Sequence, residues 1–394
     1  MNSVSTMDRV LRSVYLDAIT NNLNMHTSLF YNRIEKSSAN VYGKEIIAPC
    51  RFGINGGIAS VPETDNLPEA APSEFSTLRA PLMNIYGNIE FSDKLVKISE
   101  SGQGSSVDLI NDELEGLLQA ARFNLRRMLF QNGSGRLAYL IQEGAAGTNY
   151  VVVNETKNLA KGMIIDFVLE DDVVATGYKI VSIGYDAGND KIVTLNKSLP
   201  STVIVSTGLY LRGSYDNEIF GIPYLFDKTV PTFYGNTRSI MNYAQPIYKT
   251  TLMLNTETIQ DCMDEIEVRG HEEPNIFVCD FWFRRQYLTY MRELGLGIDY
   301  AVLEDGYKAP LFSGIPICAD RFMGEKKGYF LNTNDFVLGQ LGDWSWVEGN
   351  DHTILHPIPG KAAYNATLVK YCNLICTRPT AQLELSYNTD TVGN

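Results

Sequence analysis

Histidines are the first residues whose type and spacing could support metal or catalytic chemistry. His352 and His356 form the one pair at helical spacing, but Pro357 follows directly and the glutamate of a metalloprotease motif is missing. The pair therefore predicts two loop histidines and no metal site. His26 and His271 are isolated in the sequence, so neither suggests a catalytic partner.

Glycine-rich and acidic stretches are the next candidates. Gly53–Gly57, Gly102–Gly104 and Gly133–Gly135 lack the Lys-Ser or Lys-Thr of a phosphate loop, and none has the setting of a dinucleotide fold. Gly102–Gly104 precedes an expected helix N-terminus, where an anion can bind, but a flexible joint is the simpler interpretation. The acidic run Glu170–Asp172 lacks the ligand spacing of an EF-hand and predicts a solvated turn.

The sequence pattern offers no grouping of catalytic side chains. It contains no Gly-x-Ser-x-Gly elbow and no set of Ser, His and Asp on which to build a triad. Carboxylates are abundant, but a sequence alone does not pair them, so a carboxylate-based hydrolase stays open as an alternative. We therefore expect no catalytic residue, no cofactor and no metal, and we expect that the protein is not an enzyme.

Length and composition bound the class of protein. The 394 residues are too many for one ordinary core and indicate two or three domains, and 44% apolar residues indicate a folded chain. A net charge of −13 argues against tight nucleic-acid binding, because such surfaces cluster Lys and Arg. No apolar run is long enough to span a bilayer, and residues 1–17 lack a signal-peptide pattern. We therefore expect that the protein does not associate with a membrane.

Cysteine and tryptophan usage adds two expectations. Six cysteines without a Cys-x-x-Cys pair indicate buried free thiols in a reducing cytoplasm. Trp344 and Trp346 alternate, so in a strand they lie on one side while Asp343 and Ser345 lie on the other. Aromatic residues of this kind either anchor subunit interfaces or pack in the core.

The central element that the sequence predicts is a long amphipathic helix with a glycine turn, Ser105–Gly135. Acidic residues crowd its first turns and Arg122, Arg126 and Arg127 its last, as the helix dipole favours. Gly133 supplies a left-handed stop. We expect the apolar stripe to pack on the chain's own sheet, and Arg122 and Arg126 to face solvent or neighbouring chains. The stripe comprises Val107, Ile110, Leu114, Leu117, Leu118, Ala121, Leu125, Met128 and Leu129.

Before this helix, residues 44–99 predict a long two-stranded ribbon. It has a first limb at 46–61, a Pro-rich tip at 62–81 and a return limb at 82–98. A lone ribbon of this length is barely stable in water and exposes its edges, so we expect it to lie on a neighbouring subunit. Residues 7–34 predict an amphipathic helix or helix pair that docks elsewhere. The candidate contact residues of the ribbon are Pro62, Pro68, Phe75, Arg79 and Pro81.

The chain after the long helix divides into two blocks. Short runs of β-branched and aromatic residues between 149 and 213, among them 203–205, predict a small barrel or sandwich. From residue 218 onward the pattern is α+β, with two helices between short strands. The final limb, 366–377 with 383–385, has no helical period, and we expect it to return to the sheet near the long helix.

This order of parts resembles the tailed-bacteriophage major capsid proteins of the HK97-like fold. Phe130–Ala138 is similar to the family's glycine turn after its spine helix, and residues 149–226, with Glu218–Ile222 near their end, resemble its β insertion. Tyr234–Ser239 resembles another recurrent family segment. The axial-domain pattern of the family is similar to Phe312–Ile317, Asp320 and Gly328–Asn332.

The resemblance implies an α+β chain with the HK97-like capsid fold, divided into named regions. These are an N-terminal arm (1–43), an extended E-loop (44–104), a peripheral domain with the spine helix (105–148), a β-rich insertion domain (149–215), an axial domain with part of the peripheral domain (216–365) and a C-terminal return strand of the peripheral domain (366–394).

The resemblance also implies a function. It indicates a major capsid protein that self-assembles into hexamers and pentamers of an icosahedral head, which encloses phage double-stranded DNA without sequence-specific binding. The implied partners are other copies of the chain, a portal protein, a decoration protein where one is present and, because the arm starts at once, a separate scaffolding protein. The implied location is the virion capsid, after assembly in the host bacterial cytoplasm.

One departure from the family pattern concerns cross-linking. Some members join an E-loop lysine to an asparagine of a neighbour, but no lysine lies between Glu45 and Asp93, so we predict a non-covalent shell. Two alternatives to the capsid interpretation remain. The first is an encapsulin-type nanocompartment shell, which shares the fold but is usually shorter and lacks the β insertion. The second, less favoured, is the carboxylate-based hydrolase.

Overall fold

The fold is a computed structural model that describes residues 28–51, 55–63, 66–73, 75–100, 104–142, 147–185, 191–239, 241, 244–303, 308–349 and 353–388. It divides into two compact units, one formed by residues 127–224 and the other by the chain on either side. The predicted helices before residue 28, His26, His352 and most of the glycine joint at 102–104 lie outside the described residues. No helix within the described ranges has the length and apolar character to cross a bilayer.

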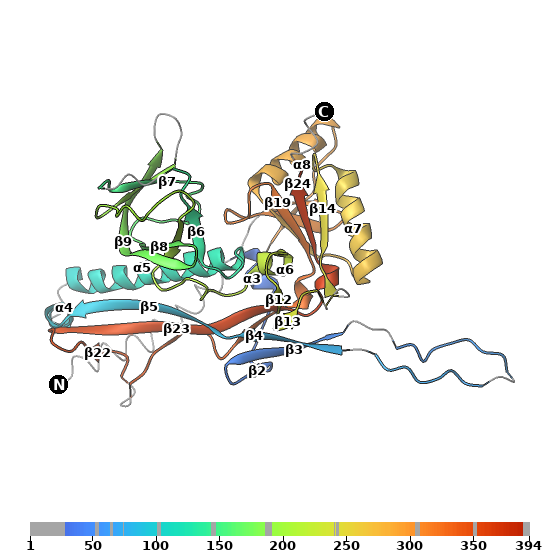
Figure 1. Cartoon of the computed structure of the whole chain (residues 1–394), viewed down its shortest axis with the longest axis horizontal. Coiled ribbons are helices and arrows are strands. Elements are labelled where there is room, and N and C mark those ends of the chain that lie inside the picture. The colour runs from blue at the N-terminus through green and yellow to red at the C-terminus, as the bar shows by residue number, and fades with distance from the viewer. Residues whose placement is uncertain are drawn as a thin grey trace. The chain divides into compact units, whose positions relative to one another are not determined.

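The predicted long helix is α5 (Gly104–Leu129), which has 26 residues. Figure 1 shows it lying along strand β5 (Met83–Ser92). The contact is close, because a Cβ added at Gly87 of β5 would lie 2.7 Å from Leu117 Cδ1. The expected packing on the chain's own sheet is therefore confirmed at Leu117, and the later stripe residues Leu114, Leu118, Ala121 and Leu125 are buried. The side chains of Val107 and Ile110 lie outside the described residues. Beyond the helix, Gly133 has the predicted left-handed backbone, with φ at 90°.

The sheet that carries α5 is organised by its longest strand, β23. Within the described chain it has six strands in the order β1-β20-β23-β21, and β5 and β22 also pair with β23. The pairing of β23 with β5 is antiparallel and runs from Ala363↔Ser92 to Cys372↔Met83. The bounds of the other strands are β1 (Glu35–Ser37), β20 (Phe336–Gln340), β21 (Ser345–Trp346), β22 (His356–Pro357) and β23 (Ala363–Cys376).

Trp344 and Trp346 pack into this sheet as the alternation predicts. They are 3% and 5% exposed, whereas Ser345 between them is exposed. Their indoles therefore belong to the subunit's own core. The remaining short elements of the described chain, outside the sheets above and below, are α3 (Leu29–Arg33), α4 (Asp93–Glu100), α6 (Ile222–Phe226), β12 (Thr232–Phe233), β13 (Asn236–Thr237), η3 (Thr333–Asp335) and η4 (Pro379–Ala381).

The predicted return limb at 82–98 is wrong. The strand that pairs with β3 (Glu45–Arg51) is β4 (Phe75–Pro81), in a short sheet with β2 (Val41–Tyr42). Strand β5 instead joins the larger sheet, where Ile85, Ile89 and Phe91 are buried. The next residues form the helix α4, which an ion pair between Lys97 and Asp93 at 2.7 Å supports. The apolar residues Leu95, Val96 and Ile98 are too few for their spacing to distinguish a helix from a strand.

The β-rich block is a small barrel. Among the described residues its sheet has the order β6-β11-β8-β9-β10-β7. A bridge between Leu140 and Val153 then joins β6 to β7 and closes the ring. The predicted strand at 203–205 is wrong, because residues 203 and 204 lie in a loop and residues 205 and 206 form a turn, in which Ser206 has a φ of 70°. The strands are β6 (Arg136–Tyr139), β7 (Tyr150–Val153), β8 (Ile164–Leu169), β9 (Asp172–Tyr185), β10 (Lys191–Leu195) and β11 (Gly208–Leu211).

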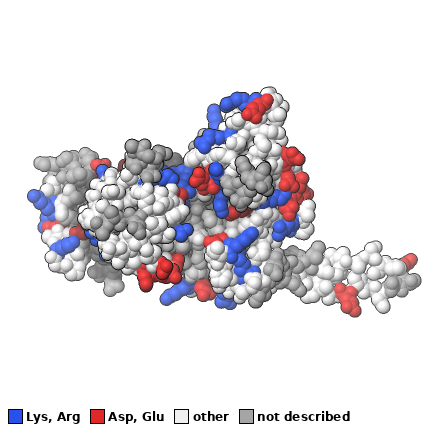
Figure 2. All heavy atoms as spheres, turned by 45° about the horizontal axis from the view of Figure 1, so that its top comes forward, with Lys and Arg blue, Asp and Glu red and all other residues white. Residues whose placement is uncertain are grey.

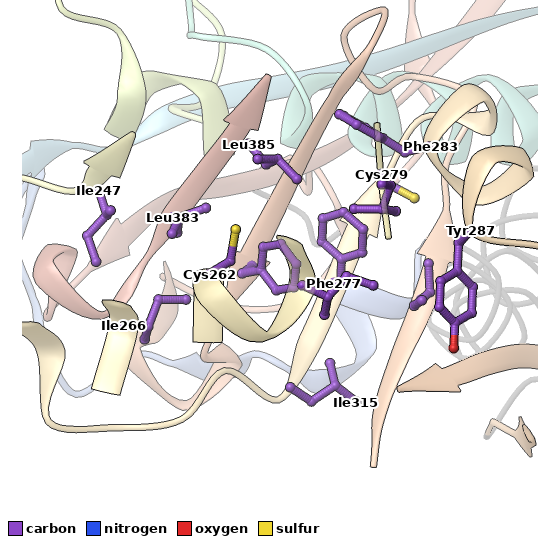
Figure 3. Close-up of a cluster of buried hydrophobic side chains, with 14 of the residues drawn as sticks. Ile247, Cys262, Ile266, Phe277, Cys279, Phe283, Tyr287, Ile315, Leu383 and Leu385 are labelled. Carbon is purple, nitrogen blue, oxygen red and sulfur yellow. The ribbon is translucent and has the colours of Figure 1, made fainter. Parts of the chain in front are cut away.

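The α+β block contains a sheet with the order β14-β24-β19-β15-β18-β17-β16 in the described chain. Helices α7 (Thr256–Gly270) and α8 (Phe281–Glu293) pack against this sheet and share one buried cluster with it. The cluster includes Cys262 of α7, Phe277 of β15 and Leu383 of β24 (Figure 3). Asn255 caps α7 and Asp280 caps α8 through side-chain oxygens. The strands are β14 (Ile247–Thr251), β15 (Ile276–Cys279), β16 (Tyr300–Val302), β17 (Lys308–Phe312), β18 (Ile315–Ala319), β19 (Lys327–Leu331) and β24 (Leu383–Tyr387).

The C-terminal limb divides between two sheets. Its first part, β23, lies in the sheet under the long helix, as expected. Its second part, β24, does not return there and instead lies between β14 and β19 of the other sheet. The reason is burial, because Leu383 and Leu385 are fully enclosed in the cluster with α7 and α8. The expectation for 383–385 is therefore corrected.

Cysteine chemistry follows the prediction. All six cysteines fall in described stretches and are free and buried. Burial raises the pKa of the Cys262 and Cys318 thiols to about 12, so both remain protonated near neutral pH. These thiols act as small core side chains.

Candidate functional site

The most distinctive feature of the chain is the ribbon, by which we mean β3, β4 and the described residues between them. Its two strands pair antiparallel from Glu45↔Pro81 to Arg51↔Phe75. Near the base, one face is buried through Ile46 and Leu78, and the opposite face is exposed. This one-sided alternation is typical of an antiparallel sheet that covers a core on one face only.

The base of the ribbon is anchored on the six-stranded sheet. Ile46 lies against Gly339 of β20, where an added Cβ would meet Ile46 Cδ1 at 2.6 Å. The buried Asn373 of β23 donates from Nδ2 to the carbonyl oxygen of Pro81 at 2.7 Å. The glycine and the asparagine together fix the start of the ribbon to the body of the subunit.

Beyond Arg51 and Phe75 the ribbon continues as the tip, residues 55–63 and 66–73. Its two limbs remain connected, since Gly56 N donates to Ala71 O at 3.1 Å. Ile58 and Leu67 are 87% and 85% exposed. Figure 2 shows a mainly uncharged surface here with a few acidic side chains. Exposed apolar residues on an extended segment form a surface suited to binding another protein.

Five of the predicted contact residues lie on this ribbon. Pro62 is exposed on the tip and Pro68 is half-buried there. Phe75, Arg79 and Pro81 are exposed, but they belong to strand β4 and not to the tip. Arg79 also forms an ion pair across the ribbon, with 3.5 Å between Arg79 Nη1 and Glu45 Oε2.

Arg122 and Arg126 were expected on an outward face of the long helix. Arg126 is instead held within the chain, because its Nη2 and Nε lie 2.8 Å and 2.9 Å from Oδ2 of the buried Asp320. Arg122 is half-buried, and its Nε is enclosed without a hydrogen-bond partner. The Arg126 guanidinium is therefore paired within the chain, while its side chain remains 35% exposed. Its partner is 194 residues away, so no local pattern indicates this pair.

A second interaction that the sequence did not indicate lies near the two ends of the barrel unit, residues 127–224, which we call the barrel neck. Arg127 and Glu218 are 0% and 1% exposed and form a two-pronged ion pair with distances of 2.8 Å and 2.5 Å. Arg127 also donates to Gln131 Oε1 at 2.6 Å. Gly221 lets the two chain segments approach, since an added Cβ would lie 2.4 Å from Gln131 O. Gln131, Glu218 and Gly221 belong to the stretches 130–138 and 218–222 that the sequence singled out, whereas Arg127 precedes the first of them.

A third polar cluster lies where the chain crosses between the six-stranded and seven-stranded sheets. Asp335 Oδ2 accepts a hydrogen bond from Gln382 Nε2 at 3.0 Å, and Asp335 Oδ1 lies 3.5 Å from Arg378 Nε. Arg378 also pairs with Glu272 at 2.9 Å. Burial, opposed by the Arg378 charge, raises the pKa of the Asp335 carboxyl to about 6.

The described residues contain no cluster of three or more His, Cys, Asp or Glu that could hold a metal ion. His356 lies at β22, where its Nε2 is 3.2 Å from the carbonyl oxygen of Val347. His271 ends α7 in a left-handed conformation. The two described histidines therefore lie at a strand and at a helix end, and neither belongs to a cluster of potential metal ligands.

Comparison with known proteins identifies the fold. No protein-family model matches the sequence, and no curated protein matches it. The capsid asymmetric unit of cyanophage A-1(L) is similar, with a TM-score of 0.52, 10% identity, and coverage of 93% of this chain and 92% of that chain. The holo-SrpI encapsulin complex from Synechococcus elongatus PCC 7942 has a TM-score of 0.46, 10% identity, and coverage of 92% and 91%. The likeness to the cyanophage capsid shows that this α+β chain has the HK97-like capsid fold.

Proposed function

We propose that this chain is a tailed-bacteriophage major capsid protein that assembles into hexamers and pentamers of an icosahedral head. The observation that carries the proposal is the capsid-like fold combined with an anchored ribbon whose tip is apolar and exposed. A surface of this kind gains free energy when it is buried on another copy of the chain. The role is structural, and the chain acts without catalytic residues or a cofactor.

The proposed contents and partners follow from this role. The head encloses double-stranded DNA, and the net charge of −13 supports a wall that does not bind the DNA tightly. Other copies of the chain are the main partner. The further proposed partners are a portal protein, a separate scaffolding protein and, where one is present, a decoration protein. The proposed location is the virion, after assembly in the host cytoplasm.

The proposed contact surface is the ribbon. Pro62, Pro68, Phe75, Arg79 and Pro81 lie on it and are the residues we assign to contact with a neighbouring subunit. Arg122 and Arg126 are kept as weaker candidates, because Arg122 Nε is enclosed and Arg126 is paired with Asp320. The assignment rests on exposure and on the open edges of the ribbon.

Removal of the tip tests the proposal. Arg51 and Phe75 are directly paired, so an Asn-Gly turn can replace residues 52–74 and close a two-residue hairpin. This replacement spares β4, whose Leu78 and Ala80 are buried. We expect the wild type to form closed shells in electron micrographs, and the shortened chain to stay folded but unassembled.

A matched control separates the reach of the tip from its chemistry. In it, a Gly-Ser linker of equal length replaces residues 52–74, which retains the span and removes the apolar side chains. We expect this variant also to fail in assembly. A wild type that remains a monomer under all assembly conditions contradicts the capsid function, and shells from the shortened chain contradict the role of the tip. Closed shells that bind a cargo peptide and lack a genome would favour the encapsulin alternative.

The absence of lysine between Glu45 and Asp93 leads to a second prediction. A shell held by non-covalent contacts dissociates to single chains of 44.0 kDa in boiling denaturant with reductant. Denaturing gels of purified particles provide the measurement. A ladder of heavier bands that survives this treatment would show covalent cross-links between subunits.

A further inference from the structure

A short hairpin lies against the ribbon where the ribbon leaves the body of the subunit. The hairpin consists of β12 and β13, and its turn residues Tyr234 and Gly235 both have positive φ, at 44° and 79°. This is the backbone of a tight type I′ turn. We call the three residues Tyr234–Asn236 the clamp.

The clamp bonds to the outer edge of β4. The Arg79 N–H donates to the Tyr234 carbonyl oxygen at 2.8 Å, and Asn236 Nδ2 donates to the Thr77 carbonyl oxygen at 2.9 Å. Gly235 lies close to the same strand, because an added Cβ would be 3.2 Å from Arg79 Cβ. The edge of β4 that faces away from β3 is therefore covered at Thr77 and Arg79.

The clamp is itself held rigidly by the body of the subunit. Phe233 and Tyr234 are 0% and 1% exposed, and their ring centroids are 4.8 Å apart. The guanidinium of Arg238 lies 4.8 Å from the Phe233 ring centroid, and its Nε donates to Val230 O at 3.1 Å. Gln245 Nε2 in turn donates to the Arg238 carbonyl oxygen at 3.1 Å. Burial and these bonds restrict movement of the clamp relative to its support.

These contacts end close to the point where the ribbon becomes free. Thr77 is two residues from Phe75, the last paired residue of β4, and the exposed tip follows. The other anchors, Ile46 on Gly339 and Asn373 on Pro81, act nearer the base. A small rotation at Thr77 therefore moves the tip through a much larger distance, because the tip lies farther from the pivot.

We infer that the clamp sets the direction in which the ribbon leaves the subunit and thereby selects the surface of a second copy that the tip reaches. Asn236 is the positioning residue of this device, since its side chain is the part of the clamp that bonds Thr77. The step to a second copy rests on the proposed function. The step from clamp to ribbon direction rests on the subunit alone.

A substitution that preserves volume isolates the clamp bond. Asn236→Asp replaces the donor amide by a carboxylate that faces the carbonyl oxygens of Thr77 and Tyr234. Thr237→Ala is the matched control, because Thr237 is exposed in the same hairpin and pairs with Thr232. Asn236→Ala is the milder second variant, for use if Asn236→Asp fails to fold.

Two readouts on unassembled subunits follow the ribbon directly. Spin labels on Ser60→Cys and Ser345→Cys report the distance from tip to sheet, and the buried native thiols do not compete. We expect Asn236→Asp to broaden this distance distribution and to speed amide exchange at Arg79 about fivefold, the effect of one lost hydrogen bond. We expect Thr237→Ala to match the wild type in both readouts.

A third readout is the particle population under assembly conditions. We expect Asn236→Asp to form irregular or fewer closed shells while its unfolding midpoint stays close to that of Thr237→Ala. Unchanged distance distributions in Asn236→Asp and Asn236→Ala contradict the inference that the clamp sets the direction of the ribbon, even if the wild type assembles normally. Broadened distributions with unchanged shells overturn the selection of the neighbour's surface. A wild type that forms no shells rejects the proposed function, and the spin-label result still decides the clamp.

Discussion

The barrel and the ribbon are both built from antiparallel strands, but they treat their strand edges differently. In the barrel, the bridge between Leu140 and Val153 closes the ring, so the strands it joins have partners on both sides. In the described part of the ribbon, the outer edge of β4 is covered at Thr77 and Arg79 by the clamp and at Pro81 by Asn373. The described barrel therefore closes on itself within one chain, whereas the tip of the ribbon leaves apolar side chains such as Ile58 and Leu67 exposed.

Burial follows the same division. Phe167 and Val193 inside the barrel are 0% exposed. Ile58 and Leu67 on the ribbon tip are 87% and 85% exposed. The barrel therefore encloses a core of its own, while the described tip of the ribbon exposes its apolar side chains.

Excision of each region gives the largest expected difference. The fragment 127–224 contains the closed barrel and its core, so we expect it to fold alone and unfold cooperatively on heating. The peptide 41–82 contains the ribbon without its support, so we expect no cooperative transition. Circular dichroism during thermal melts provides the measurement. A ribbon peptide that folds alone would remove the basis of the comparison.

Ion pairs in the two regions predict the next largest difference. Arg127→Ala leaves the buried Glu218 carboxylate without its partner, which should destabilise the chain by about 3–5 kcal/mol. Arg79→Ala removes an exposed pair in the ribbon, which should cost less than about 1 kcal/mol. Denaturant unfolding of both variants measures the contrast. Equal losses would mean that the barrel neck does not depend on this pair.

The polar cluster of Asp335, Arg378 and Gln382 predicts a smaller, pH-dependent effect. The folded chain raises the pKa of Asp335 from 3.8 to about 6, so between these values the folded state binds more protons than the unfolded state. The Asp335 contribution to stability is therefore full below the lower value and is lost as pH rises through the upper one. Asp335→Asn lacks this titration, so relative to the wild type it should gain about 1–3 kcal/mol between about pH 4 and pH 7.

The measurement is the unfolding free energy of both chains across this pH range. The comparison uses the difference between variant and wild type, because other carboxylates contribute a common slope to both curves. A difference that stays constant with pH would show that Asp335 does not titrate in this way. Glu272→Gln is a useful second variant, since Glu272 pairs with Arg378 in the same cluster.

The long helix and the barrel were predictable because their signals are local. The apolar period of α5 and the closely spaced short strands of 149–213 can be read from neighbouring residues. The partner of β3 was not predictable in this way, since β4 and β5 follow one another and both suit a strand. Pairing of β5 with β23 depends on residues more than 270 positions away, for which the sequence has no local signal.

Side-chain partners show the same limit. The exposure of Pro62 and Phe75 was expected from a ribbon with open edges. The inward pairing of Arg126 with Asp320 was not, because a helix pattern shows which residues share a face but not what packs on that face. The segment Tyr234–Ser239 was singled out by its resemblance, but its contact with the ribbon was not predicted, because that contact joins a hairpin to a strand 159 residues earlier.

The central claim is that the ribbon of one subunit lies on another. A cryo-electron microscopy map of particles assembled from the wild-type chain tests it most directly, because the path of residues 45–81 can be traced from each subunit. The account predicts that the tip, with Ile58 and Leu67, is buried on a neighbouring copy. A map in which the tip contacts only its own subunit or solvent would contradict the account.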